Sequence, residues 1–301
     1  MPINLSEKGD SPWMIHKILW ATDGSKDASE ALKYVDMFAV KYKASVIGLS
    51  VVPEYHGVIE GFSEEEKDRF VRWMEGSVKE KEKKRLEDIE RAFGARGIIF
   101  RKELVDGIPY REILRVATEK KVDLIAMGKG RAAEKSILGG TALKVLRKSN
   151  IPVLTAREDS RGLGMKRILV PTDQSRGLYR DFKYAIELSK SFGARVYILN
   201  VVETGEQMFP LEIIEQMKGF CFRELNENIG KVKIGEDIDV AVEASKNAWS
   251  GIIRFVDSKD IDLIVMMTYG GGRLKEEFIG SVTQKVIQEA PCPVLTITPY
   301  S

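Results

Sequence analysis

Apolar and polar positions alternate along the chain in two distinct patterns. Short runs are apolar almost throughout, and between them lie longer segments in which apolar residues recur every three or four positions, for example residues 29–42 and 179–192. The short runs predict buried strands, and the longer segments predict amphipathic helices. Strands that are buried on both faces and alternate with helices indicate an α/β fold built on a doubly wound parallel sheet.

This succession of strands and helices occurs twice. Residues 16–25 and 166–175 both form an apolar run followed by Thr-Asp-x-Ser, and three further pairs of runs recur in the same order: 44–52 with 194–202, 122–127 with 261–266, and 151–155 with 292–296. Such a repeat predicts two tandem domains. We expect them at residues 13–157 and 165–299, joined by a polar linker at 157–164.

The first copy is longer in its middle, where residues 64–91 are strongly charged and contain no proline. The spacing of its apolar residues predicts a helix with one apolar stripe, a solvated charged face over residues 79–85, and Trp73 as an anchor in the core. A helix that docks on a protein or on a membrane surface is the alternative.

Composition narrows the class of protein. The 301 residues are 44% apolar and 31% charged, which suits globular domains. No apolar run reaches the roughly 18 residues of a membrane helix, residues 1–13 are too charged for a signal peptide, and two cysteines fit a reducing compartment, so we expect a cytoplasmic protein that contacts no membrane. The net charge of +2 predicts no nucleic-acid partner.

Catalytic and metal chemistry have little support in the sequence. The two histidines, His16 and His56, do not pair with each other or with cysteine at the spacing of metal ligands. A zinc site and a histidine-based catalytic triad are therefore disfavoured. We predict no catalytic residue and no metal ligand.

Acidic residues follow the first strand of each copy. Open α/β sheets bind ligands beyond the carboxyl ends of their strands, and Asp23 and Asp173 stand at that place, just before a helix. Each carboxylate is suited to cap the helix by accepting backbone hydrogen bonds. Each is equally suited to accept a hydrogen bond from a ribose hydroxyl or a base amine, and the sequence leaves both roles open.

Glycines follow a later strand of each copy. In the second copy, a glycine-rich loop at 270–272 precedes Gly280 and Ser281, where a helix begins. Glycines allow close approach to a ligand and a helix N-terminus attracts phosphate, although a flexible loop with a serine N-cap is the alternative. Gly128-x-Gly130-x-x-Ala133 matches the dinucleotide fingerprint, but it follows the fourth strand and lacks the later acidic residue, so NAD is disfavoured. No Walker loop is present.

Together these motifs resemble the universal stress protein family. The resemblance rests on a strand ending Pro-Thr-Asp-x-Ser, an Asp-Leu-Ile-Val-Met strand, Gly-x9-Gly-Ser before a helix and a closing Pro-x-Pro-Val-Leu, and it covers nearly the whole chain twice. It implies a tandem two-domain member with two parallel five-stranded sheets of the adenine-nucleotide α-hydrolase-like fold. The family divides into members that bind ATP and members that do not, by the motif Gly-x2-Gly-x9-Gly-Ser or Thr.

The resemblance also implies nucleotide contacts at matching positions. In the second copy, Met267 replaces the first glycine of the motif, and Asp173 and the backbone of Val201 would face adenine or ribose. The full set there is Pro171, Thr172, Asp173, Val201, Met267, Gly270, Gly280, Ser281, Val282 and Thr283, of which Gly270 and the last four would surround the phosphates.

The glycine loop of the first copy is shorter, and we expect an altered site. Counting from Gly130 makes Gly140 and Thr141 the Gly-Thr pair, whereas the helix register favours Gly139 as the glycine and places Gly140 at the hydroxyl position. The candidates in this copy are Thr22, Asp23, Val51, Gly128, Gly130, Gly139, Gly140 and Thr141, with Lys129, Arg131 and Lys135 as further groups that would attract phosphate.

We therefore expect a tandem universal stress protein that binds an adenine nucleotide, ATP or AMP, alone or with Mg²⁺, as a regulatory ligand in the stress response. The alternatives are an interaction module without nucleotide and a slow ATPase or phosphotransferase. By the same resemblance, residues 152–154 and 293–295 of the final strands would pair the two halves into an intrachain pseudo-dimer. A homodimer through another face is a second expectation.

Overall fold

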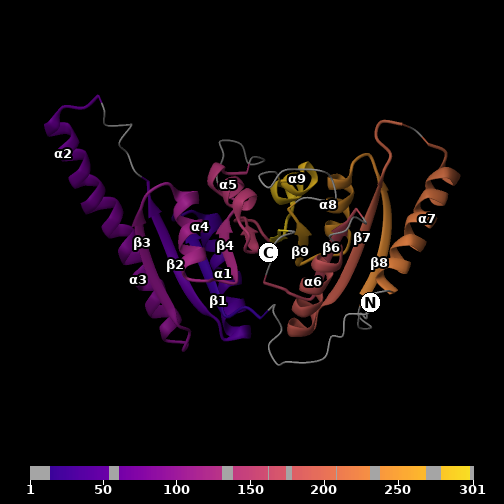
Figure 1. Ribbon diagram of the computed structural model, residues 1–301, viewed down its shortest axis with the longest axis horizontal. Coiled ribbons are helices and arrows are strands. Elements are labelled where there is room, and N and C mark those ends of the chain that lie inside the picture. Colours follow the sequence, from indigo (N-terminus) through magenta and orange to yellow (C-terminus); the bar gives the residue numbers. More distant parts are fainter. Residues whose placement is uncertain are drawn as a thin grey trace.

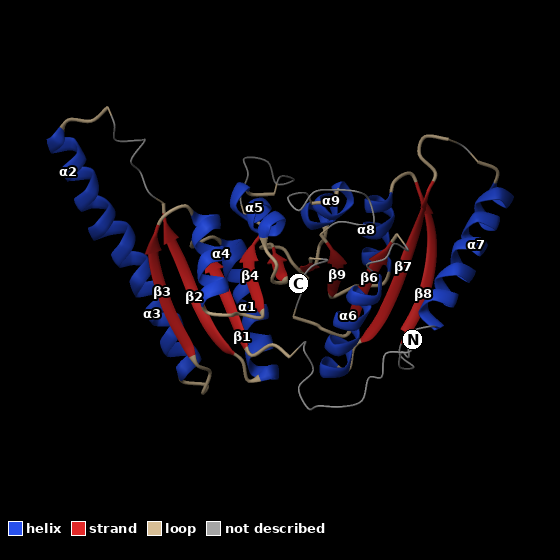
Figure 2. Ribbon diagram, in the orientation of Figure 1, coloured by secondary structure: helices blue, strands red, loops and turns tan. Residues whose placement is uncertain are grey.

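Strands and helices alternate as the apolar pattern predicts (Figures 1 and 2). The computed structural model describes residues 14–53, 61–130, 138–161, 163–173, 178–207, 209–230, 238–268 and 279–298. The first half contains β1 (Lys17–Thr22), α1 (Lys26–Tyr42), β2 (Ser45–Val52), α2 (Glu64–Trp73), the π-helix η1 (Met74–Lys79), α3 (Glu80–Gly94), β3 (Phe100–Asp106), α4 (Pro109–Glu119), β4 (Leu124–Gly128), α5 (Gly140–Lys148) and β5 (Val153–Ala156).

The second half repeats this order with one helix in place of α2, η1 and α3. It contains β6 (Arg167–Thr172), α6 (Leu178–Phe192), β7 (Arg195–Glu203), α7 (Leu211–Gly230), β8 (Ile238–Ser245), α8 (Ala248–Ser258), β9 (Leu263–Met267), α9 (Ser281–Glu289) and β10 (Val294–Ile297). Among the helices so described, none is long and apolar enough to cross a membrane.

The strands form one sheet in the order β3-β2-β1-β4-β5-β10-β9-β6-β7-β8. Neighbouring strands are parallel within each half, which confirms the two five-stranded parallel units. β5 and β10 pair antiparallel, with Leu154 opposite Leu295, so the predicted pairing of the final strands is confirmed and the two units form a single continuous sheet. The pairing satisfies two strand edges that would otherwise expose unpaired backbone groups.

The core has one layer on each face of the sheet. Ile18 and Trp20 of β1 pack in the cluster that includes residues of α1 and α3, whereas Leu19 and Ala21 pack in the cluster that includes residues of α4 and α5. Because both faces of β1 are covered by helices, the strand is apolar almost throughout. The order also reverses between β1 and β4, which is where an open α/β sheet forms a crevice.

Side chains also connect the two halves. The Tyr34 hydroxyl of α1 donates to the Arg161 carbonyl at 2.8 Å, and the Arg161 guanidinium donates to Asp257 of α8 at 2.6 Å. The Thr155 and Thr296 hydroxyls donate across the β5–β10 seam to the carbonyls of Val294 and Val153. The linker and the seam therefore hold both halves in contact.

The longer middle of the first half forms a helical insertion, α2–η1–α3. Figure 1 shows α2 projecting beyond the end of the sheet, and α2 has no buried residue. Trp73 is 55% exposed and contacts Phe70, so the prediction that it anchors the core is wrong. The physical reason is that α2 extends past the strands, so Trp73 lies beside Phe70 of the same helix, and Phe62 lies next to Phe70. The charged face over 79–85 is not solvated throughout either, because Glu82 and Arg85 turn toward the sheet.

Candidate functional site

A cavity of about 370 Å³ opens at the carboxyl edge of the sheet in the first half. It is bounded by the ends of β1, β2 and β4 and by the beginnings of α1, α4 and α5, with η1 and α3 forming a further wall. Its lining lies at the predicted crevice beside the reversal of strand order. A cavity of this size is within the range of small-molecule sites.

Every candidate residue of the first copy lines this cavity. These residues come from three separate parts of the chain: the turn after β1, the end of β2 and the glycine loop between β4 and α5. The fold brings them together at one cavity: Thr22, Asp23, Val51, Gly128, Gly130, Gly139, Gly140 and Thr141. The further residues Arg131 and Lys135 lie outside the described part of the chain.

The turn after β1 directs Asp23 to the cavity. Ser25 is the N-cap of α1, since its hydroxyl accepts from the Ala28 amide at 3.2 Å. Asp23 instead accepts from the Ser25 amide at 3.0 Å through Oδ1, so the N-cap role considered for Asp23 is wrong. The buried Trp20 indole N–H donates to the Ala28 carbonyl at 2.8 Å and holds the beginning of α1 against the sheet.

Three glycines shape the opposite side of the cavity. A Cβ on Gly128 would lie 2.7 Å from the Ala28 nitrogen, so only glycine lets β4 end this close to α1. Gly130 has a φ of +80°, which favours glycine. A Cβ on Gly139 would approach the Gly130 Cα to 3.1 Å. These positions bring the N-termini of α1 and α5 to the same cavity.

The N-terminus of α5 supplies hydrogen-bond donors. The helical bonding of α5 begins where the Leu143 amide donates to the Gly139 carbonyl. Gly140, Thr141 and Ala142 precede that bond and line the cavity, and the first amides of a helix have no partner within it. The positive end of the helix dipole acts in the same place, so this side of the cavity favours an anionic group.

The structure resolves the register of the first glycine loop. Gly139 and Gly280 are the N-caps of α5 and α9, and their amides donate to the carbonyls of Lys129 and Thr268 at 3.0 and 2.7 Å. The helix register is therefore confirmed: Gly139 matches Gly280, and Gly140 stands where the second half has Ser281.

Lys129 serves a different purpose from the one expected. Its side chain is buried and Nζ donates to the Gln288 carbonyl of α9 in the other half at 2.6 Å. Burial lowers the pKa of this lysine below its ordinary value. The expectation that Lys129 attracts phosphate is wrong, because its ammonium group bridges the two halves.

Of the second-half candidates, Gly270 lies in residues 269–278, outside the described part of the chain. Pro171, Thr172 and Asp173 stand at the end of β6, with Asp173 exposed, and Val201 lies on β7. The Val201 side chain lies close to Gly251 of α8. Met267, Gly280, Ser281 and Val282 lie at the end of β9 and the beginning of α9, and the buried Thr283 hydroxyl donates to the Met267 carbonyl at 2.9 Å.

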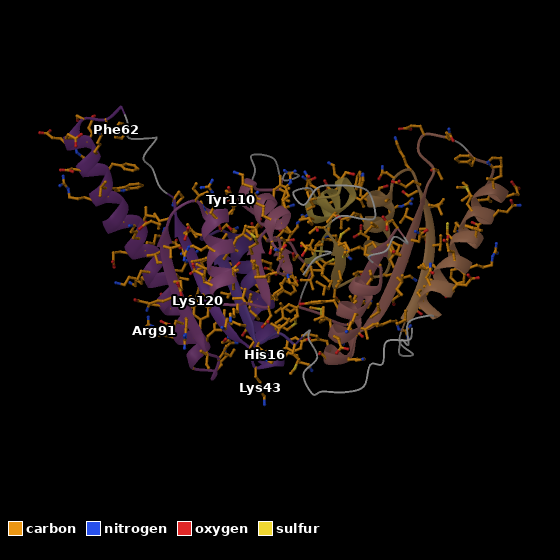
Figure 3. All side chains as sticks on the ribbon, viewed as in Figure 1. His16, Lys43, Phe62, Arg91, Tyr110 and Lys120 are labelled. Atoms are coloured by element: carbon orange, nitrogen blue, oxygen red, sulfur yellow. The ribbon has the colours of Figure 1, made fainter. Side chains whose placement is uncertain are left out.

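Two carboxylates line the first cavity, and one of them, Glu82, is paired with Arg85 at 2.6 Å. Of the described residues that line it, Asp23 and Glu82 carry charged side chains. No group of three His, Cys, Asp or Glu residues able to hold a metal ion occurs in the described ranges. His16 lies at the opposite edge of the sheet from Tyr110 at the beginning of α4, as Figure 3 shows, and His56 lies outside the described residues. The cavity is thus suited to bind a polar ligand through backbone amides, hydroxyls and carboxylates.

Several lining residues escaped the sequence analysis, notably Ser25, Ser50, Val78 and Glu82. Ser25 ends the Thr-Asp-x-Ser motif, so its position as an N-cap was a readable signal. Ser50 lies within an apolar strand run, and the repeat places Asn200 at its position. Val78 and Glu82 belong to the longer segment of the first half, where the second half has the single helix α7, and the repeat therefore gave no residue-by-residue match for them.

The chain is similar to known proteins along most of its length. It matches the universal stress protein family over residues 14–157 and 164–298. It is 34% identical to the universal stress protein MJ0531 of Methanocaldococcus jannaschii over 138 residues, which cover 44% of this chain and 81% of that protein. It is 32% identical to MJ0577 of the same organism over 155 residues, which cover 48% of this chain and 96% of that protein.

A solved structure extends the likeness to the two halves together. The crystal structure of a universal stress protein from Archaeoglobus fulgidus aligns with a TM-score of 0.66 at 24% identity, covering 94% of this chain and 96% of that chain. At this identity the likeness concerns the fold alone.

Proposed function

The chain belongs to the universal stress protein family, and on this premise we propose that it binds an adenine nucleotide, ATP or AMP, as a regulatory ligand. The binding site that we propose for the first half is the cavity at the ends of β1, β2 and β4. We propose a second site at the matching residues of the second half, around Asp173, Val201 and the N-terminus of α9.

The observation that carries the proposal is the convergence of the eight first-half candidates on one cavity. The family resemblance selected these residues from sequence motifs alone, without any knowledge of a cavity. Their convergence supports a ligand that contacts the β1 turn, the end of β2 and the glycine loop together.

The phosphates would bind at the N-terminus of α5. The amides of Gly140, Thr141 and Ala142 lie there together with the positive end of the helix dipole. The nucleoside would then lie along the ends of β1 and β2, where Asp23 offers a carboxylate and Val51 offers backbone groups.

Mg²⁺ would act with ATP rather than with the protein alone. The described lining carries two carboxylates, Asp23 and Glu82, of which Glu82 is paired with Arg85, and the lining itself holds no basic side chain. A triphosphate brings several negative charges to such a site, and a bound cation would offset the repulsion. The proposal therefore includes tighter binding of ATP in the presence of Mg²⁺, and a smaller effect of Mg²⁺ on AMP.

Equilibrium binding tests the proposal directly. Isothermal titration with ATP and with AMP, on protein stripped of nucleotide by unfolding and refolding, gives the affinity and the number of sites per chain. We expect saturable binding, and the absence of any binding at millimolar nucleotide would contradict the proposal. Chromatography of whatever is released from freshly purified protein identifies the natural ligand independently.

Two matched variants assign the sites. Gly140→Asp and Ser281→Asp place a carboxylate at the same first-turn position of α5 and of α9. An acidic residue there suits the helix dipole, so the fold should be retained, but it repels phosphate. Each variant should therefore weaken the site in its own half by at least about tenfold, a loss of about 1.4 kcal/mol, and leave the other site unchanged.

We propose binding without turnover as the primary activity. A slow ATPase or phosphotransferase would need a base or metal site, and the carboxylates of Asp23 and Glu82 are the acidic groups that the described lining offers. ADP release that stays proportional to protein concentration through successive purification steps would reverse this view. We also propose a cytoplasmic location, which cell fractionation tests. A homodimer of the whole chain is a further proposal, which light scattering tests.

A further inference from the structure

Glu82 forms part of the cavity wall although it belongs to the helical insertion. It lies on α3, one turn after Val78 of η1, and both residues line the cavity beside the ends of β1 and β2. The carboxyl side chain is 18% exposed. A carboxylate that is largely enclosed loses solvation, so it needs hydrogen-bond donors around it.

Two neighbouring side chains hold this carboxylate in place. The Ser50 hydroxyl donates to Glu82 Oε2 at 3.2 Å, and Arg85 Nη2 donates to the same oxygen at 2.6 Å. Arg85 Nη2 also donates to the Thr22 hydroxyl at 2.9 Å, which ties the pair to the end of β1. Both hydrogen bonds from the described residues reach Oε2, which leaves Oε1 as the acceptor for a further donor.

The second half is built differently at this place. Asn200 stands at the position of Ser50, since Thr22 is paired with Ser50 and Thr172 with Asn200 in the two sheets. Its side-chain amide donates to the Thr172 carbonyl at 2.9 Å. The described α7 is one regular helix of 20 residues, where the first half has α2, η1 and α3. The Glu82 carboxylate, held by hydrogen bonds from Ser50 and Arg85, therefore distinguishes the first half from the described part of the second.

We propose that Glu82 determines which nucleoside the first cavity accepts. Its Oε1 atom accepts a hydrogen bond from a donor on the nucleoside part of the ligand, either a ribose hydroxyl or the adenine amine, while Ser50 and Arg85 fix the carboxylate. A carboxylate only accepts hydrogen bonds and repels phosphate, so it faces the nucleoside and not the phosphates at α5. This inference rests on the proposed function, because it assumes a nucleotide in that cavity.

The isosteric variant Glu82→Gln separates shape from chemistry. A glutamine has one carbonyl oxygen, and the Arg85 guanidinium can only donate, so the oxygen stays with Arg85 and the NH₂ group turns toward the ligand. An acceptor becomes a donor with little change in volume. Glu80→Gln is the matched control, since Glu80 lies on the same helix with a side chain 67% exposed.

The experiment compares ATP with three analogues, 2′-deoxyATP, 3′-deoxyATP and purine riboside triphosphate, which lack the 2′-hydroxyl, the 3′-hydroxyl and the adenine amine respectively. It uses Ser281→Asp protein, so that the first site is measured alone. At least one analogue should bind that protein about tenfold more weakly than ATP, which identifies the donor. Adding Glu82→Gln should weaken the binding of ATP by about tenfold and leave the affinity for that analogue nearly unchanged. Adding Glu80→Gln should change neither of these two affinities.

A second variant covers the case in which Glu82→Gln fails to fold. Ser50→Ala removes one of the two hydrogen bonds that fix the Glu82 carboxylate. It should reduce the discrimination between ATP and that analogue without abolishing ATP binding. Equal affinities for all four nucleotides, or discrimination that survives Glu82→Gln, would overturn the role of Glu82 and leave the proposed function intact. No ATP binding by unsubstituted protein would overturn both.

Discussion

Gly139 and Gly280 hold the same position in the two halves, each as the N-cap of the helix that follows a glycine loop. Their backbone angles agree closely, with φ −59° and ψ 143° for Gly139 and φ −60° and ψ 142° for Gly280. Each amide also donates to the carbonyl of the residue just beyond the preceding strand. The first residues of the two helices, Gly140 and Ser281, thus hold equivalent positions, and the serine adds a hydroxymethyl group that the glycine lacks.

This equivalence predicts a gain of function in the first half. Gly140→Ser should bind nucleotide more tightly than the unsubstituted first site, by up to about tenfold, because it adds a hydroxyl donor beside the helix amides. A Cβ on Gly140 meets no atom within 4 Å, so the substitution fits. Titration in a Ser281→Asp background isolates the first site. Unchanged affinity would mean that the phosphates do not reach this position.

Trp20 and Trp73 should respond very differently to truncation. Trp20 is 1% exposed and donates its indole N–H to Ala28, so Trp20→Ala should cost about 3–5 kcal/mol of unfolding free energy. Trp73 is 55% exposed, and Trp73→Ala should change stability by no more than about 0.5 kcal/mol. Urea unfolding of both variants measures the contrast, and a large loss for Trp73→Ala would show that α2 packs against the domain in solution.

The buried Lys129 should make stability depend on pH. Burial lowers the pKa of this lysine below its ordinary value of 10.5 in the folded protein. At a pH between the pKa of the folded protein and 10.5, the lysine is therefore more fully protonated in the unfolded chain than in the folded protein. Stability from this group therefore rises with pH over that window. As the pH rises toward 10.5, the unsubstituted protein should gain unfolding free energy relative to Lys129→Met. Lys84→Met, at an exposed side chain, is the control, and a stability difference between unsubstituted protein and Lys129→Met that does not change with pH would contradict the prediction.

Cys292 should be chemically inert in the folded protein. Burial raises the pKa of its thiol to about 12, so the reactive thiolate form is strongly disfavoured at pH 8. In a Cys221→Ser background, we expect a thiol reagent to modify Cys292 only after denaturation. Rapid modification at pH 8 without denaturant would show that the β5–β10 region opens readily.

Much of the fold could be predicted from the sequence because it depends on local patterns that occur in both copies of the repeat. The apolar strand runs, the amphipathic helices and the Thr-Asp-x-Ser turns each have a signature within a few residues, and the repeat confirmed one copy against the other. The first-half candidates could also be named, because they stand at positions that match the motifs of the family. That they lie together follows from the sheet, since the carboxyl ends of parallel strands meet at one edge.

The insertion was the part least open to prediction. Its apolar stripe is a sound sign of a helix, but the pattern carries no information on how far that helix extends past the strands. Trp73 was therefore placed in the core and is exposed, whereas Glu82 was placed on a solvated face and lines the cavity. Both outcomes depend on where α2, η1 and α3 lie relative to the ends of β1 and β2.

The sequence by itself determined the two-domain repeat, the α/β class and the motifs that mark the family, because these follow from the order of residues along the chain. Only the tertiary structure decided that Lys129 bridges the halves, that Asp23 is not the cap of α1, and that Glu82, Ser50 and Arg85 form one hydrogen-bonded group. The physical reason is that each of these depends on the direction in which a side chain points, which a local pattern does not record. For Lys129 and for the contact between Ser50 and Glu82, it also depends on a partner far away in sequence.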